Sequence, residues 1–309
     1  MGVSMTDFKV GLVHSPVTPF KRDHAVDYDT YAKLIEFHLK NGAEALAAPM
    51  PEGEDLSLTD PEQAKLLAFA IKQVKGRVPV IAHVSDAGTA IAVERARNAE
   101  KAGAAAIVSH PPYFWHANAA MVLEHIVQIG SSVGLPFFVY NPPVESVGVH
   151  VTRDLVLKLI ERLGNFRGVV DSEMDFVFME DVVPNGKAAR PDFQYVSGAD
   201  YMVPAGVVGG SGAFSSLAAI APNLVRHVYD LCAKQDYIEA RTGQEHLAAL
   251  RQLVKHPRLE TGLKAALRAM GRDCGNPRPP SRALGEVEYG AASEALAALA
   301  FLKAEPRGW

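Results

Sequence analysis

Short apolar runs alternate with longer amphipathic segments along most of this chain, and this alternation constrains the fold more than any other feature. Eight such pairs occur in succession within the first 220 residues. Strict alternation of this kind predicts a parallel sheet with helices outside it. Eight units are the number that closes a (β/α)₈ barrel. A doubly wound open sheet is the alternative, and the lack of a Gly-x-Gly-x-x-Gly turn after the first run disfavours it.

The predicted strands are short, rich in apolar residues and bounded by turn residues. They cover Lys9–Val17, Ala43–Ala48, Val78–His83, Ala105–Ser109, Leu135–Tyr140, Phe166–Val170, Phe193–Ser197 and Gly206–Gly209. Helix starts are indicated by Asp27, by the capping box Thr59-x-x-Glu62 and by Thr152. From Ala221 onward the pattern is helical throughout. We therefore expect residues 1–220 to form the barrel and residues 221–309 to form a C-terminal helical region.

The charge and the cysteine content limit which classes of binding partner and which cellular compartment we expect. The net charge is −4 with a pI near 6.3, and no large basic face is evident, so we expect no nucleic-acid partner. Two cysteines, Cys232 and Cys274, are too few for a disulfide framework and fit a reducing compartment. No apolar run reaches the roughly 20 residues that span a bilayer, and no signal peptide is evident. These features predict a cytoplasmic protein without a membrane partner.

Several short motifs occur in a fixed order across almost the whole chain. They include Val17-Thr18-Pro19-Phe20, Gly53-Glu54, Pro111-Pro112-Tyr113-Phe114, Tyr140-Asn141-Pro142-Pro143, Gly168-Val169-Val170-Asp171-Ser172 and Arg278-Pro279-Pro280. Together they resemble the dihydrodipicolinate synthase / N-acetylneuraminate lyase family of class I aldolases. The resemblance implies a (β/α)₈ barrel with a helical extension, a small carboxylate or 2-oxo acid as ligand, no cofactor, and a homo-oligomer, either a dimer or a tetramer built from dimers.

The sixth predicted strand carries the main departure from that family. Its members keep a lysine there that forms a Schiff base with a 2-oxo acid, whereas this chain has Val170. An isopropyl group has no lone pair, so the covalent step cannot occur at this position. Lys187 and Lys264 are the two alternative amines, although neither follows a predicted strand. Val170 is expected to line the ligand pocket without reacting.

The loop after the second predicted strand also differs from the family's pattern. The family uses hydroxyl groups there to hold the substrate carboxylate, and this chain has Met50-Pro51-Glu52-Gly53-Glu54. Gly53 and Glu54 are predicted to contact the substrate, Glu54 chiefly as a structural group. Glu52 is either a recruited base or a solvated carboxylate that would repel an anionic ligand. Ser15, beside His14 at the first strand end, is predicted to face inward.

Proton transfer in this family passes through a tyrosine at the end of the fifth strand. Tyr140 matches that position and is predicted to be a proton donor or a group that orients the substrate. The second tyrosine of the synthase relay is replaced by Phe114, which is predicted to contact the substrate instead. These departures make synthase activity of the usual kind doubtful.

Three histidines, His14, His83 and His110, fall at or near predicted strand ends, which meet at one mouth of a barrel. Alternation along the strand makes His83 the best inward candidate, either as an acid–base group or as a space-filling ring. No metal site is predicted, although a metal-dependent lyase remains an alternative. Gly209-Gly210-Ser211-Gly212 is either an anion cradle that includes Gly210 or a tight turn that only glycine permits.

The sequence therefore predicts a lyase-family protein that acts on or binds a small 2-oxo acid or related carboxylate without a lysine Schiff base. Tyr140, Glu52 and His83 are its candidate catalytic residues. The alternative is a pseudoenzyme that binds the ligand without turning it over.

Overall fold

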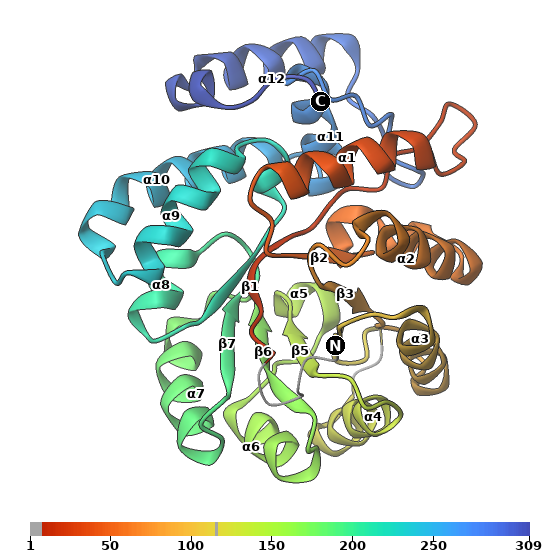
Figure 1. The fold of residues 1–309 in the computed structure, drawn as a ribbon, viewed down its shortest axis with the longest axis vertical. Coiled ribbons are helices and arrows are strands. Elements are labelled where there is room, and N and C mark those ends of the chain that lie inside the picture. The colour runs from red at the N-terminus through yellow and green to blue at the C-terminus, as the bar shows by residue number, and fades with distance from the viewer. Residues whose placement is uncertain (1–7, 115–116) are drawn as a thin grey trace.

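The computed structural model describes residues 8–114 and 117–309, and in it eight parallel strands close a barrel in chain order. The first strand pairs with both the second and the eighth, which is what closes the sheet. The strand bounds are β1 Gly11–His14, β2 Ala45–Ala48, β3 Val80–His83, β4 Ala106–Ser109, β5 Phe137–Asn141, β6 Phe166–Asp171, β7 Gln194–Ser197 and β8 Gly212–Ser215. The closed barrel predicted from the alternation is confirmed (Figure 1).

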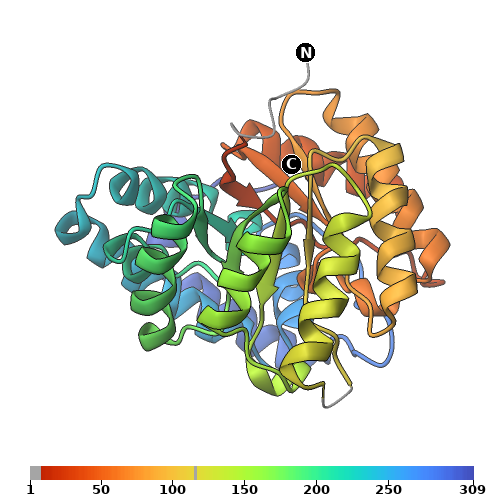
Figure 2. The same ribbon diagram turned by 90° about the horizontal axis from the view of Figure 1, so that it is seen from below.

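Helices surround the strands, as the two views show (Figures 1 and 2). The helices of the barrel are α1 Tyr28–Lys40, α2 Asp60–Val74, α3 Thr89–Ala102, α4 Ala119–Ser131, the single turn α5 Val144–Val147, α6 Arg153–Arg162, α7 Phe176–Ala189 and α8 Met202–Val207. Those that follow the last strand are α9 Pro222–Ala233, α10 Tyr237–Val254, α11 Leu259–Ala269 and α12 Glu286–Ala298.

The predicted helix starts have the expected capping bonds. The Asp27 carboxylate accepts a hydrogen bond from the amide of Thr30 at the start of α1. At α2 both halves of the capping box form between Thr59 and Glu62. At the start of α6 the Thr152 hydroxyl accepts a hydrogen bond from the amide of Leu155. Short-range sequence signals therefore decide where these helices begin.

The predicted eighth strand over Gly206–Gly209 is wrong. Gly206 belongs to the end of α8, and the strand runs instead over Gly212–Ser215. The glycines between them form a tight connection: Gly209 has a φ of 92°, and a side chain at Gly210 would meet the Ala205 carbonyl oxygen at 2.7 Å. This turn precedes β8, so it lies at the amino ends of the strands, away from the mouth.

The helices after β8 share a core with the first strand and helix. Leu12 of β1 and Leu34 of α1 are fully buried in one cluster with residues of α9, α10 and α11. Figure 1 shows α11 next to α1, and α9 and α10 beside α8. No helix in the described part of the chain is long and apolar enough to cross a membrane.

Inside the barrel a separate apolar cluster fills the space between the strands. It includes Val13, Ile81, Phe138, Tyr140 and Val170. Tyr140 and Val170 face each other across the β5–β6 pair in register. The carboxyl ends of these strands therefore open onto a packed apolar floor rather than a channel.

Candidate functional site

A cavity of about 740 Å³ lies over the carboxyl ends of the strands. Its walls come from the loops after β2, β4, β5 and β6, from α10 and from the start of α11. The polar lining residues are Glu52, Glu54, Asp55, Ser57, His110, Tyr113, Tyr140, Ser146, Ser172, Arg251, Arg258, Glu260 and Ser281. In a barrel of this kind the mouth is where side chains from several strands converge. We call this space the mouth cavity.

Tyr140, at the end of β5, presents a hydroxyl to the mouth cavity. Its Oη shares a hydrogen bond of 2.6 Å with Ser172 Oγ and lies 3.4 Å from the Gly198 carbonyl oxygen. Burial raises the pKa of Tyr140 above its usual value, and the nearby Glu52 carboxylate adds to the effect. The phenol is therefore protonated at neutral pH and can donate a hydrogen bond.

Val170 is fully buried beside Tyr140 in the apolar cluster inside the barrel and, contrary to the prediction, does not itself line the cavity. No lysine lines the mouth cavity in the part of the chain that the structure describes. The ammonium of Lys187 donates to the Gly209 carbonyl oxygen at 2.7 Å, at the opposite end of the barrel. Lys264 faces Glu54 from the other side and lines a different cavity. The structure therefore brings neither alternative amine into the mouth.

Glu52 stands in the short 3₁₀ turn Pro51–Gly53 that follows β2. It is 9% exposed, and among the described residues its Oε2 has no hydrogen-bond partner. Burial raises the pKa of Glu52, with Asp200 and Asp55 reinforcing the shift and Arg251 opposing it. The raised pKa makes this carboxylate a stronger proton acceptor than an exposed glutamate.

Asp200, after β7, is a second buried acid on this side of the barrel. Burial raises its pKa to about 6, although Arg251 opposes the shift. Arg251 Nη1 lies 3.8 Å from Asp200 Oδ2, a loose ion pair. Arg251 reaches the cavity from α10. Among the described lining residues, the arginines therefore come from the helical extension and not from the barrel.

A chain of polar contacts runs behind the cavity wall from Asp55 to His110. His83 Nδ1 lies 3.3 Å from Asp55 Oδ2, and His83 Nε2 lies 2.6 Å from Ser85 Oγ, which accepts from the amide of His110 at 2.7 Å. Burial alone would raise the pKa of Asp55, but the hydrogen bond and charge of His83 lower it. Asp55 is therefore ionised at neutral pH.

The His110 ring separates His83 from Tyr140. Its centroid lies 4.6 Å from that of His83 and 4.9 Å from that of Tyr140. Burial lowers the pKa of His110 to about 3, with the neighbouring His83 adding to the shift, so the imidazole is neutral at pH 7. His83 itself does not line the mouth cavity. His110 does, although the alternation along β4 favoured Ser109 as the inward residue.

Glu54 has a structural position, as the sequence suggested. Its Oε1 lies 2.6 Å from Lys264 Nζ, and its Oε2 accepts from the amide of Arg278 at 2.7 Å. Both bonds tie the loop after β2 to the helical extension. Gly53 is buried just before it, and its carbonyl accepts from Thr18 Oγ1 at 2.5 Å. Gly53 shapes the loop and does not itself line the cavity.

Three other predicted contacts lie away from the cavity. Ser15 lies at the end of β1, where its amide donates to the Ser215 carbonyl oxygen at 2.9 Å. Phe114 is 86% exposed on the loop after β4, and the neighbouring Tyr113 lines the cavity in its place. Gly210 lies in the turn before β8, at the amino ends of the strands. These three predictions differ from the structure because hydrophobic periodicity predicts neither the exact end of a strand nor the path of the loop that follows it.

Ser172, Arg251 and His110 are site residues that sequence reasoning did not select. Ser172 directly follows β6, and its place in the strand-six motif was a usable signal. Arg251 comes from α10, far along the chain from β6, so no local pattern could have placed it. His14 instead faces α1, where its Nδ1 lies 3.1 Å from His38 Nδ1. Among the described residues no group of three or more potential ligands is arranged to hold a metal ion.

Comparisons with known proteins agree with this geometry. The model of the "Dihydrodipicolinate synthetase family" matches residues 9–299. A relative from Rhodopseudomonas palustris, named 4-hydroxy-tetrahydrodipicolinate synthase, is 33% identical over 258 residues, which cover 83% of this chain and 85% of the relative. One from Archaeoglobus fulgidus with the same name is 29% identical over 290 residues, covering 94% and 98%.

Solved structures give the same result. A putative dihydrodipicolinate synthetase from Pseudomonas aeruginosa superposes with a TM-score of 0.88 at 29% identity, covering 94% of this chain and 99% of that one. A prophage protein of the dihydrodipicolinic acid synthase family from E. coli K12, solved in complex with pyruvate, has a TM-score of 0.88 at 26% identity, covering 94% and 98%.

Proposed function

Because this chain belongs to the dihydrodipicolinate synthetase family, we propose that it is a lyase that acts on a small 2-oxo acid or related carboxylate without a lysine Schiff base. One observation supports the proposal: the mouth cavity keeps the Tyr140 hydroxyl, while its neighbour across the β5–β6 pair, Val170, stands where the resemblance implies the family's lysine. The family supplies the ligand class, and one of its solved members holds pyruvate.

The chemistry must then rely on proton transfer and hydrogen bonding. The protonated phenol of Tyr140, backed by Ser172, donates to the carbonyl oxygen of the ligand and stabilises the charge that develops there. Glu52, with its raised pKa, takes a proton from the carbon next to that carbonyl. The product of this step is an enolate, whose oxygen keeps the hydrogen bond from the Tyr140 hydroxyl. Arg251, one of the two arginines that line the cavity in the described chain, holds the ligand carboxylate.

The first test is reduction with borohydride in the presence of pyruvate, followed by intact-mass measurement and peptide mapping. The R. palustris relative serves as the positive control, since the resemblance implies a Schiff base there. We expect no adduct on this chain. An adduct on Lys264, Lys187 or any other lysine would overturn the proposal.

The second test separates an enzyme from a binding protein. Exchange of the methyl protons of pyruvate in heavy water, followed by NMR, reports the proposed proton transfer without assuming a second substrate. We expect Tyr140→Phe to slow this exchange by about 10²- to 10⁴-fold while pyruvate binding persists. Saturable binding with no exchange in the unmodified protein favours the pseudoenzyme, which the buried apolar floor around Val170 also fits.

We also propose that the chain forms a homodimer or homotetramer and works in the cytoplasm. The family resemblance supports the assembly, and the free thiols Cys232 and Cys274 of the described chain fit a reducing compartment. Light scattering coupled to size-exclusion chromatography measures the assembly directly, and a monomeric mass at all concentrations would contradict it.

A further inference from the structure

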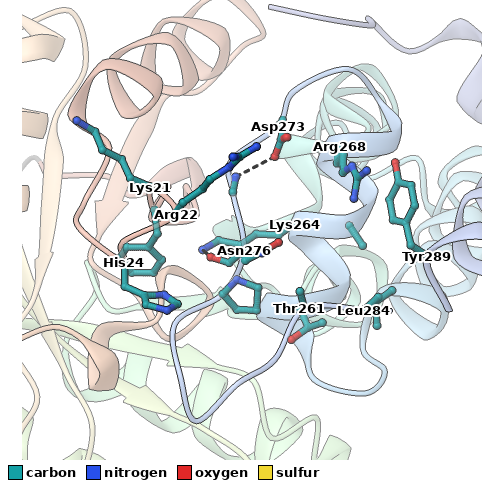
Figure 3. Close-up of a pocket in the computed structure, with 15 residues that line it drawn as sticks. Lys21, Arg22, His24, Thr261, Lys264, Arg268, Asp273, Asn276, Leu284 and Tyr289 are labelled. Carbon is teal, nitrogen blue, oxygen red and sulfur yellow. Dashed lines mark hydrogen bonds between the residues drawn. The ribbon is translucent and has the colours of Figure 1, made fainter. Parts of the chain in front are cut away.

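A second cavity, of about 200 Å³, lies between the loop after β1 and the helical extension (Figure 3). Its walls come from residues 20–24, from α11, from the loop 273–277 and from the start of α12. Lys264 lines this cavity, whereas its partner Glu54 lines the mouth cavity. The Lys264–Glu54 ion pair therefore lies between the two spaces. We call this space the junction cavity.

The junction cavity is lined by more positive than negative side chains. Arg22 and Arg268 come from the loop and from α11, and neither forms an ion pair with any described residue. The guanidinium of Arg268 lies 4.1 Å from the ring centroid of Tyr289. Asp273 is the one carboxylate among the described lining residues, and its Oδ1 already accepts from the amide of Gly275 at 2.9 Å. Figure 3 shows Arg22 extending toward Asp273.

Lys264 forms the buried floor between these arginines. Its Nζ lies 2.6 Å from Glu54 Oε1, with 2% of each side chain exposed, and donates to the Asn276 carbonyl oxygen at 3.2 Å. The same nitrogen lies 4.2 Å from the ring centroid of Phe20. Water is largely excluded around this ammonium, so its field is weakly screened on the cavity side.

We propose that the junction cavity binds a small dianion, either inorganic phosphate or a compact dicarboxylate. Arg22 and Arg268 are the guanidinium groups free to form paired hydrogen bonds with its oxygens, and Lys264 adds charge from below. The volume of about 200 Å³ admits an ion of this size. A second guanidinium makes a dianion a better match than a monoanion.

Occupancy of the junction cavity is linked to the mouth cavity through Lys264. A dianion beside the Lys264 ammonium competes with the Glu54 carboxylate for the ion pair with that ammonium. Glu54 belongs to the loop after β2, which also carries Glu52 and Asp55. Binding at the junction therefore loosens the segment 50–57, and that segment forms one wall of the mouth cavity.

The site is tested by titrating the full chain with inorganic phosphate in calorimetry, with malonate in a parallel arm. We expect the double variant R22A/R268Q to bind phosphate about tenfold or more weakly, because two charge-assisted contacts are lost. Lys33→Ala is the control: it removes one positive charge from the exposed face of α1, outside the residues that line the cavity, and should bind nearly as the unmodified protein does.

Equal phosphate affinity in the unmodified protein and the double variant, with both folded by circular dichroism, would overturn the site. Binding of malonate alone, lost in the same variant, keeps the site and assigns it to dicarboxylates. The link is read by amide hydrogen exchange over residues 50–57, which saturating phosphate should accelerate in the unmodified protein but not in the double variant. Unchanged exchange in the phosphate-bound protein refutes the link. Both measurements are independent of any ligand in the mouth.

Discussion

Glu52 places a buried carboxylate in a cavity that, on the proposed function, receives an anionic ligand. Its pKa is raised by burial, yet any ionised fraction repels the carboxylate of a 2-oxo acid. We predict that Glu52→Gln binds pyruvate about 3- to 10-fold more tightly at pH 8 and abolishes proton exchange. Calorimetry and NMR measure the two effects. The affinities should converge as the pH falls, because Glu52 then takes up a proton.

Asp200 gives the folded chain a pH dependence with a defined sign. Its folded pKa of about 6 lies above the ordinary value of 3.8, so the folded state binds the proton more tightly than the unfolded state. The protonated Asp200 side chain therefore contributes fully to the free energy of unfolding below about pH 4, and this contribution is lost as the pH rises through about 6. We predict that Asp200→Asn is more stable than the unmodified protein at pH 7 by about 1–3 kcal/mol.

Urea unfolding between pH 4 and pH 8 measures this difference. Asn also tolerates the left-handed backbone of this position, where φ is 61°. The stability difference should grow between pH 4 and pH 7 and then level off. A difference that stays constant over this range would show that the group does not titrate as stated.

At the scale of elements, the loop after β2 is held by contacts with the helical extension. The Lys264–Glu54 pair is almost fully buried, so removing one partner leaves an uncompensated charge. We predict that Lys264→Met lowers the free energy of unfolding by about 3–5 kcal/mol. Lys187→Met is the matched control and should cost less than about 1 kcal/mol, since Lys187 lies at the surface and donates one bond.

The double variant Lys264→Met with Glu54→Gln should recover part of the lost stability, because the buried negative charge is removed as well. Urea unfolding of the four proteins gives the coupling energy between the two positions. A double variant as unstable as the sum of its single variants would indicate that the pair does not interact.

The element boundaries show where local signals suffice. Asp27, Thr59 and Thr152 cap the helices they were predicted to cap, because a capping bond spans only two or three residues. The eighth strand was misplaced because the apolar Val207-Val208 fits a strand or a helix end equally well over so short a run. Pairing with β1, which is a long-range contact, selects Gly212–Ser215 instead.

At the scale of the whole molecule, the barrel and the later helices share one apolar core. Leu12, Val17 and Leu34 are completely buried together with side chains of α9, α10 and α11. Each would lose about 1.5–3 kcal/mol of burial energy if those helices were removed. The sequence-based division at residues 220 and 221 stays a prediction, and a shared core argues that the two parts do not fold independently.

We therefore predict that a truncated chain of residues 1–220 fails to form a stable monomer. The full chain should unfold in one transition by circular dichroism and fluorescence, with coincident midpoints. The truncated chain should be insoluble or should unfold without a cooperative transition. A sharp transition from the truncated chain would mean that the barrel is stable on its own.

The sequence by itself determined the architecture of this protein and the absence of an amine at position 170. Alternating strands and helices specify a closed barrel through local periodicity, and Val170 lacks a lone pair wherever the chain places it. Only the tertiary structure decided the composition of the site. Arg251 and Lys264 reach it or its border from helices far along the chain, and the burial that shifts the pKa values of Glu52 and Asp200 depends on packing among all of these segments.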